Sequence, residues 1–561
     1  MNNIFTDLKH NFAIDEKKWQ ECLAELKDHR GSLVKVLTAK GLAEEKPLLE
    51  FLSEKTGLLF KGSIEAMIEE QAVSSVSAKA ALHYNFMPLY LDKDMICLAI
   101  HDPLDTISLD EIGLLLKKKI SFVLTLQKNI IDAARKFYGL GAETLESLEE
   151  EKGPELEIER GQNDEDIDNS DIDPSVIKFF NQILADAITQ RATDIHLEPF
   201  EDDLRIRYRI DGMLHEVSSP QNIKNFQSSI ASRIKVMANL DIAEKRRPQD
   251  GRVKVKMAGA VYDLRVSILP APFGESIVIR ILSRTSPVIG LRKLGLTEEG
   301  FTVLERMIEK PHGIILVTGP TGSGKTTTLY SCLNKINSPQ RKILTIEEPI
   351  EYQLSGITQM QAEPKIGFTF ASALRSMLRH DPDVMMVGEI RDTETARLAV
   401  RTALTGHLVF STLHTNDSAS SITRLMDMEI DPYLVASSVI LIIAQRLVRN
   451  NCPHCLEEYI PEEEILNQFS GEDRTDVKFF HGTGCEQCRH TGYLGRSAIF
   501  EILEVNDEIR EMTLKRMPAH LIKQKAVSSG MSLLRHEGWL RVKEGKTTAE
   551  EVLRVTQEER V

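Results

Sequence analysis

The spacing of apolar and polar positions divides the chain into regions of different character. Residues 1 to about 140 alternate helical patterns with short apolar strands such as Met95–Ile100. A helical pattern over Ser175–Gln190 opens the next region, and from about 290 onward strands and helices alternate in the order typical of a largely parallel sheet covered by helices on both faces. Strand-like runs of the middle region are Leu204–Ile210, Val261–Ser267 and Ser276–Leu282.

An acidic segment separates the first two regions. Glu143–Asp173 carries fourteen acidic residues against two basic ones and has no aromatic residue. Such a segment cannot bury enough apolar surface to offset the entropy lost on ordering, so the composition predicts a flexible linker. The predicted domains are residues 1–142, a linker over 143–173, a second domain over 174–286 and a third over 287–561.

Composition restricts the class of protein. A chain of 561 residues with 42% apolar and 27% charged residues is typical of a soluble protein with three or four domains. The formal net charge of -15 argues against nucleic acid as the main partner. The longest apolar run, Ala436–Ala444, is too short to cross a bilayer, and the first residues lack the pattern of a signal peptide. We therefore expect a cytoplasmic protein.

The segment Ile314–Thr328, IILVTGPTGSGKTTT, carries the clearest chemistry. A short apolar strand leads into a loop that matches G-x-x-x-x-G-K-[ST], and a helix-forming run follows. Backbone N–H groups of such a loop point at phosphate oxygens, Lys325 is predicted to reach the β- and γ-phosphates of ATP, and Thr326 to bind Mg²⁺. The predicted nucleotide-binding residues of the loop are Gly319, Pro320, Thr321, Gly322, Ser323, Gly324, Lys325, Thr326 and Thr327.

Acidic residues follow two apolar strands beyond this loop. Val384–Val387 is followed after one glycine by Glu389, and Ile343–Ile346 is followed by Glu347 and Glu348. Because the carboxyl ends of parallel strands meet at the edge where phosphates bind, these carboxylates are candidates to polarise the attacking water or to hold Mg²⁺ through water. The alternative for each is a solvated residue at a strand end. Glu389 is the first candidate.

Two histidines, His407 and His414, flank another apolar strand in TGHLVFSTLHTND. A single histidine in this setting is more often a core residue with its hydrogen bonds satisfied. The position of the two residues makes them candidates for sensing the γ-phosphate, because a change from neutral to protonated imidazole suits a phosphate contact.

Four of the seven cysteines form two CxxC pairs, Cys452 with Cys455 and Cys485 with Cys488, separated by 29 residues. Four thiolates at this spacing can close a tetrahedral Cys₄ site in which Zn²⁺ has a structural role. A redox dithiol is the alternative for one CxxC. We predict a zinc module over 450–495, and we expect the other three cysteines to be buried core residues.

Together these motifs resemble the secretion ATPases of the type II secretion/type IV pilus assembly superfamily. The segments GPTGSGKTTTLY, TIEEPIEY, DPDVMMVGEIRD and TGHLVFSTLHTND occur in the order seen in that family, and DIHLEP, RYRIDG and RIKVMANLDIAEKRRPQDGR are further matches. The resemblance covers residues 174–561. In one departure, Glu348 replaces the aspartate of the family's usual E-D-P.

The resemblance implies an α/β protein with a RecA-like P-loop ATPase lobe, an N-terminal α+β (PAS-like) N2 lobe, a separate α/β N1 domain and the Cys₄ zinc module. It implies a homo-hexamer in which arginines of the N2 lobe reach the phosphates. By position the candidates are Arg207, Arg209, Arg252 and Arg265, with Arg246 and Arg247 serving there or between subunits.

The function implied is a cytoplasmic motor that hydrolyses ATP to drive pseudopilus or pilus assembly and protein export in a type II secretion system. It would lie at the inner membrane only through platform and cytoplasmic docking proteins, which the N1 domain would contact. The cysteines and the N-terminal extension favour an assembly motor over a retraction ATPase. Some relatives bind cyclic di-GMP through an Arg/Gly/Leu repeat, whose initial Arg-Leu-Gly is not in register here, so this ligand is not predicted.

Three alternatives remain open from the sequence. A type IV pilus extension ATPase would have the same ATPase lobe and would differ in its docking partners. A nucleic-acid translocase would use the Cys₄ module to grip a strand, but the acidic composition opposes this function. A nucleotide-dependent scaffold would hydrolyse little ATP, and the carboxylates beyond the P-loop oppose that reading.

Overall fold

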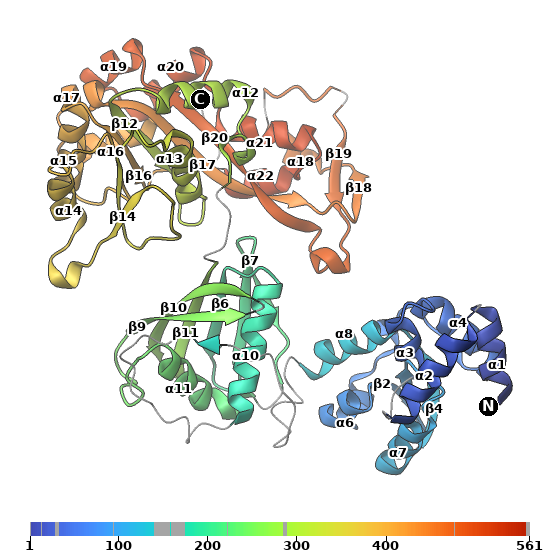
Figure 1. Cartoon of the computed structure of the whole chain (residues 1–561). Helices are drawn as coiled ribbons and strands as arrows, with labels where there is room; N and C mark the ends of the chain where they lie inside the picture. The colour runs from blue at the N-terminus through green and yellow to red at the C-terminus, as the bar shows by residue number, and fades with distance from the viewer. Residues whose placement is uncertain are drawn as a thin grey trace. The chain divides into compact units, whose positions relative to one another are not determined.

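The computed structural model describes residues 2–12, 14–28, 33–93, 95–139, 157–158, 174–220, 223–257, 259–283, 289–469, 471–475 and 477–556. The chain divides into two compact units, Met1–Leu282 and Ser283–Val561 (Figure 1). The boundary predicted between 286 and 287 lies outside the described residues, as does the predicted linker over 143–173 apart from Glu157–Ile158.

The N1 region is an α/β fold around a four-stranded sheet of order β1-β4-β3-β2. The predicted strand over Met95–Ile100 is confirmed as β3, which runs parallel to β4 and antiparallel to β2. All residues of β3 except Met95 are buried, as expected of a strand covered on both faces. The elements are α1 (Asn2–Asn11), α2 (Glu16–Asp28), α3 (Leu33–Ala39), α4 (Glu45–Thr56), β1 (Leu59–Phe60), α5 (Glu70–Ser74), α6 (Ala78–His83), β2 (Phe86–Asp92), β3 (Met95–Ile100), α7 (Thr106–Leu116), β4 (Lys119–Leu124) and α8 (Gln127–Tyr138).

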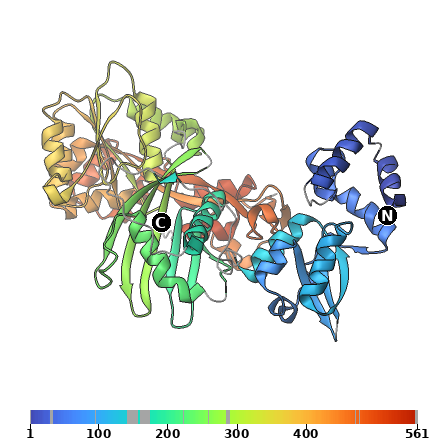
Figure 2. The same cartoon turned by 60° about the horizontal axis from the view of Figure 1, so that its bottom comes forward.

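The N2 region is a seven-stranded sheet of order β5-β9-β10-β11-β6-β7-β8, and α10 and α11 share one apolar core with it (Figures 1 and 2). Along β7, every second side chain from Leu204 to Ile210 is buried in that core, so the intervening arginines lie on the opposite face. The elements are β5 (Glu157–Ile158), α10 (Pro174–Thr189), β6 (Asp194–Pro199), β7 (Leu204–Ile210), β8 (Met213–Val217), α11 (Gln227–Met237), β9 (Gln249–Met257), β10 (Ala260–Ala271) and β11 (Gly274–Ser283).

Strand β5 departs from the sequence prediction. Glu157 and Ile158 pair antiparallel with Lys256 and Val255 of β9, where the composition predicts a spacer. The outer edge of β9 offers backbone N–H and C=O groups, and pairing them satisfies these groups whatever the surrounding composition.

The second unit contains a seven-stranded sheet of order β14-β13-β15-β16-β12-β17-β20, in which only the β17–β20 pair is antiparallel. This confirms the predicted, largely parallel α/β lobe. Its elements before the cysteines are α12 (Glu298–Ile308), β12 (Gly313–Thr318), α13 (Lys325–Ile336), β13 (Ile343–Glu347), β14 (Thr358–Gln361), α14 (Phe370–Met377), β15 (Val384–Val387), α15 (Thr393–Leu404), β16 (Leu408–Leu413), α16 (Ala419–Asp427), α17 (Pro432–Ser438) and β17 (Val439–Asn451).

The remaining elements of this unit are β18 (Leu456–Tyr459), α18 (Glu463–Asn467), β19 (Phe479–Gly482), β20 (Tyr493–Glu504), α19 (Asp507–Leu514), α20 (Ala519–Ser528), α21 (Leu534–Lys543) and α22 (Ala549–Val555). The central strand β12 shows how both faces of the sheet are covered. Ile315 and Val317 pack in one core with α12 and α13, whereas Ile314 and Leu316 pack in a second core with α14 to α17, α19 and α20. Within the described ranges, no helix combines the length and the apolarity needed to span a membrane.

Candidate functional site

The P-loop lies where the sequence predicts it, between the end of β12 and the first turn of α13. Gly319, Gly322 and Gly324 have φ values of 148°, 79° and 87°, which turn the loop tightly above the start of the helix. The buried hydroxyl of Ser323 has no hydrogen-bond partner among the described residues. A buried, unpaired polar atom in such a loop fits a phosphate oxygen as its partner.

Strand β17 forms the floor of this loop. The buried Gln445 side chain accepts from the Thr328 hydroxyl at 2.7 Å. The Arg446 guanidinium, also buried, donates to the carbonyls of Gln445 and Asn416 at 3.1 and 2.8 Å. Local sequence contains no signal for these two residues, because no neighbouring motif shows that β17 runs beneath the loop.

Gly319→Ala is expected to lower ATP affinity by about tenfold or more, because the added Cβ would lie 2.6 Å from the Gln445 carbonyl oxygen and 2.7 Å from the Ser323 hydroxyl. Gly322→Ala is the matched control: its φ is also positive, but its Cβ would meet nothing within 4 Å. Calorimetric titration with ATP measures both variants. Equal losses would show that backbone strain rather than contact with the floor limits the loop.

Lys325 folds over the loop and donates to the carbonyls of Gly319 and Pro320 at 2.8 and 3.0 Å. Burial lowers the pKa of Lys325 to about 8, with Glu389 acting to raise it and Arg446 to lower it further. A cation held in this way is stabilised by any anion that enters the loop.

The depressed pKa of Lys325 predicts how stability without nucleotide changes with pH. Between pH 8 and about 10.4, the usual lysine value, the unfolded chain keeps the proton that the native chain has lost, so the free energy of unfolding rises with pH. Across this pH window, the free energy of unfolding of the wild type should rise by about 1–2 kcal/mol relative to that of Lys325→Met. This value is discounted for the partial exposure of Lys325. Urea unfolding of both proteins measures the difference, and a constant difference would contradict the lowered pKa.

Glu389 lies two residues beyond the end of β15, at the same sheet edge as the P-loop, as predicted. Its carboxylate accepts from, or forms an ion pair with, His414 Nε2 at 3.2 Å and also pairs with Arg391. Arg391 also contacts Glu348 at 3.3 Å. Two carboxylates, one imidazole and one guanidinium thus meet at this edge. Arg391 is not among the residues predicted from the sequence, where its only signal is its place two residues after Glu389.

The contacts of Glu347 differ from those of Glu348. Its carboxylate is buried, accepts from Thr345 Oγ1 at 2.7 Å and Gln359 Nε2 at 3.1 Å, and contacts the Tyr330 hydroxyl. Burial raises the pKa of Glu347. These contacts turn Glu347 into the lobe's interior, so its predicted catalytic role has no supporting contact among the described residues.

His407 lies at the other end of the sheet from the P-loop. It precedes β16, whereas His414 follows it, and β16 runs parallel to β12. A six-residue strand is about 20 Å long, so the structure separates His407 from the loop of its own chain, against the prediction of a phosphate contact. The His407 ring instead contacts the Thr402 carbonyl oxygen at 3.0 Å.

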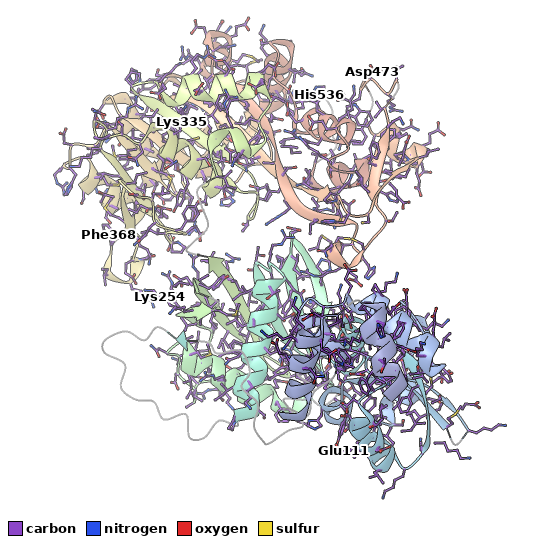
Figure 3. The ribbon with its side chains drawn as sticks, turned by 45° about the vertical axis from the view of Figure 1, so that its right-hand side comes forward. Glu111, Lys254, Lys335, Phe368, Asp473 and His536 are labelled. Atoms are coloured by element: carbon purple, nitrogen blue, oxygen red, sulfur yellow. The ribbon has the colours of Figure 1, made fainter. Side chains whose placement is uncertain are left out.

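The four candidate arginines of the N2 region share the open face of its sheet, opposite the face that α10 and α11 cover. Arg252 is the direct cross-strand partner of Arg265, and Lys254, labelled in Figure 3, follows at the next position on the same face of β9. On β7, Arg207 pairs with Glu198 at 2.7 Å, and Arg209 lies 3.9 Å from Asp194. The candidates therefore form one partly neutralised basic surface.

The four predicted cysteine ligands converge. Their sulfur atoms all lie within 4.8 Å of one another, with 3.8 Å between Cys452 and Cys485 and between Cys455 and Cys488. Burial acts to raise the pKa of the Cys488 thiol, but N–H groups of Cys485 and Gly492 bring it to about 6. Four converging sulfurs fit a tetrahedral Zn²⁺ site.

Comparison with known proteins agrees with this geometry. The family model described as "Type II/IV secretion system protein" matches residues 169–554, and an MshEN domain model matches residues 64–144. The chain is 39% identical over 523 residues to the type IV pilus assembly ATPase PilB of Myxococcus xanthus, covering 92% of each chain. It is 47% identical over 394 residues to the type II secretion system ATPase E of Vibrio cholerae, covering 70% of this chain and 78% of that protein.

A relative from Xanthomonas campestris pv. campestris, named type II secretion system protein E, is 40% identical over 534 residues and covers 94% of this chain and 93% of its own length. The crystal structure of the Legionella pneumophila ATPase DotB superposes with a TM-score of 0.50 at 22% identity, covering 67% of this chain and 94% of that one. This likeness concerns the fold alone.

Proposed function

The chain belongs to the type II/IV secretion system protein family, and from this premise we propose that it is the homo-hexameric, ATP-hydrolysing assembly motor of a type II secretion system. The family match favours the secretion class over the nucleic-acid translocase considered from the sequence. The observation that supports the motor most directly is the meeting of the P-loop, Glu389 and His414 at the ends of three neighbouring parallel strands.

In this proposal the loop N–H groups and Lys325 hold the phosphates of ATP, and the Thr326 hydroxyl ligates Mg²⁺. Glu389 orients and deprotonates the attacking water, and His414 orients the Glu389 carboxylate. Glu348 is the second carboxylate of the site, because it shares Arg391 with Glu389. The N2 arginines Arg207, Arg209, Arg252 and Arg265 are proposed to stabilise charge that develops on the phosphates.

The proposed domains are N1 over 1–142, N2 over 174–286 and the ATPase domain over 287–561, with Zn²⁺ held by Cys452, Cys455, Cys485 and Cys488 in a structural module. N1 docks the motor onto cytoplasmic and inner-membrane components of its machine, which would keep a cytoplasmic protein at the inner membrane through its partners.

A type IV pilus extension motor is the second candidate. It is supported by the match to PilB of Myxococcus xanthus, which covers 92% of this chain and so includes N1, the region expected to choose the partner; the match to type II secretion system protein E of Xanthomonas campestris covers 94% and includes N1 as well. Binding of full-length protein to the platform and docking proteins of each machine, encoded in the same genome, discriminates the two candidates.

Mg²⁺-dependent ATP hydrolysis with light scattering tests the motor itself, with Lys325→Ala as the variant expected to lose nucleotide binding. Turnover by a hexameric wild type supports the proposal. If the hexamer binds ATP but shows no turnover, even with its platform protein present, the motor proposal is wrong and the protein is a nucleotide-gated scaffold.

A further inference from the structure

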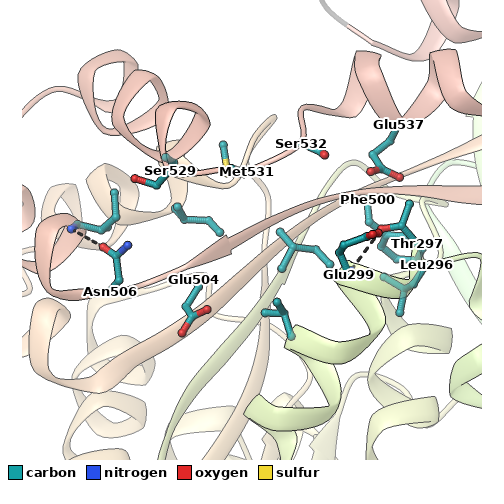
Figure 4. Close-up of a pocket in the computed structure, with 17 residues that line it drawn as sticks. Leu296, Thr297, Glu299, Phe500, Glu504, Asn506, Ser529, Met531, Ser532 and Glu537 are labelled. Atoms are coloured by element: carbon teal, nitrogen blue, oxygen red, sulfur yellow. Dashed lines mark hydrogen bonds between the residues drawn. The ribbon is translucent and has the colours of Figure 1, made fainter.

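A groove follows the outer edge of the sheet in the second unit (Figure 4). It encloses about 810 Å³ including its open mouth. Helix α12 borders one side, and the connection Ser529–Ser532 between α20 and α21 borders the other. Strand β20, the last strand in the sheet order, forms its floor.

The main chain of β20 faces this groove with hydrogen-bonding groups. The Val505 N–H donates to the Ile440 carbonyl, and the antiparallel register with β17 continues without a bulge through Phe500. By the alternation of an antiparallel ladder, the N–H and C=O groups of Phe500 and Ile502 point away from β17, toward the groove. No other backbone pairs with them among the described residues. Such an edge can accept a further strand.

The side chains of the groove combine apolar surface with negative charge. Phe500 and Ile502 pack toward α12, and Met531 lines the opposite wall. The residues that line the groove include no basic residue, but they include three glutamates, Glu299, Glu504 and Glu537.

Two of these carboxylates are poorly compensated. Glu504 pairs with Arg306 at 2.6 Å, whereas Glu299 and Glu537 form no ion pair within 4.0 Å among the described residues, and Glu537 is only 5% exposed. Burial raises the pKa of Glu537, and Glu299 raises it further, although Arg541, His536 and Ser532 act in the opposite direction. A cation placed between Glu299 and Glu537 would relieve both the desolvation and the repulsion.

We propose that this groove binds an extended, basic segment of a partner protein, which pairs with the main chain of β20 at Phe500 and Ile502 and places a lysine or arginine beside Glu299 and Glu537. Backbone pairing supplies the binding mode, the apolar wall accepts alternate side chains, and the carboxylates select a positive charge. A small amine would satisfy the carboxylates but leave the strand edge unused. The inference concerns a surface that the proposed ATPase mechanism does not use.

The test uses full-length protein and a fluorescent, end-blocked heptapeptide of alternating valine and lysine, with the valine–glutamate peptide as its counterpart. The lysine peptide is expected to bind and to slow amide hydrogen exchange at Phe500 and Ile502, but not at Leu503, which is already paired with β17. Equal binding of the two peptides would overturn the proposal. So would binding of the lysine peptide without protection of Phe500 and Ile502.

Two kinds of variant separate charge from backbone pairing. Glu299→Gln, alone and with Glu537→Gln, should weaken the lysine peptide by about tenfold, whereas Glu298→Gln, one position away and outside the groove, should not. Ile502→Pro removes one groove-facing N–H while leaving the β17 ladder intact and should also weaken binding. Unchanged affinity in Glu299→Gln and Ile502→Pro would overturn the proposal, as would binding that requires dissociation of the oligomer, since the groove would then be a subunit contact.

Discussion

Glu389→Gln is expected to lower the rate of ATP hydrolysis by about a hundredfold or more while leaving ATP affinity within about twofold of wild type. The amide keeps the size of the side chain and can still accept from His414, whose Nε2 lies 3.2 Å from the Glu389 carboxylate, but it cannot take a proton from water. Single-turnover hydrolysis, with binding of a fluorescent ATP analogue measured separately, distinguishes the two effects. Loss of chemistry without loss of binding is the signature of a group that acts in the transition state.

The chain offers a matched control for this substitution. Glu394→Gln makes the same chemical change five residues later, in the first turn of α15, where the side chain is exposed and pairs with Arg375. It should leave turnover unchanged. If Glu389→Gln kept more than about a tenth of wild-type turnover, the role of general base would pass to Glu348, the other carboxylate that Arg391 contacts.

Removing the metal from the Cys₄ site is expected to unfold the zinc module and to destabilise the ATPase lobe. Metal binding to such sites contributes on the order of 10 kcal/mol, because the unfolded chain has no preformed site. The module interrupts the antiparallel β17–β20 pair: Cys452 follows β17 directly, and β20 begins five residues after Cys488. Asn451, the last residue of β17, donates to the carbonyls of Phe480 and Gly545 at 2.8 and 3.0 Å.

Cys452→Ser combined with Cys488→Ser should therefore abolish stoichiometric zinc in elemental analysis and lower the melting temperature, and a strong chelator should have the same effect on wild type. Cys97→Ser is the control, since it removes one buried thiol from the separate N1 core. Full zinc content in the double variant would show that the metal is held elsewhere. A zinc-free wild type with unchanged melting would instead favour a redox dithiol.

Much of the candidate site follows from local sequence. The P-loop, the strand ends that carry Glu348 and Glu389, and the two CxxC pairs each depend on a few consecutive residues whose order already places donors and charges. The alternation of apolar strands and helices similarly predicts the parallel sheet, because a strand buried on both faces is a continuous apolar run. All described residues of β12, β15 and β16 are buried. Because buried positions are mostly apolar, these strands could be predicted from their apolar runs.

Local residue order was sufficient to predict the candidate residues of the site and the strands that they follow. The directions of their side chains depend on tertiary packing: Glu347 turns into the core, Glu348 turns toward Arg391, and His407 and His414 lie at opposite ends of one strand. It also brought together distant segments, as in the Gln445 floor beneath the P-loop and the acidic groove along β20. Chain order is a local property, whereas side-chain direction and neighbours depend on packing between segments that are far apart in sequence.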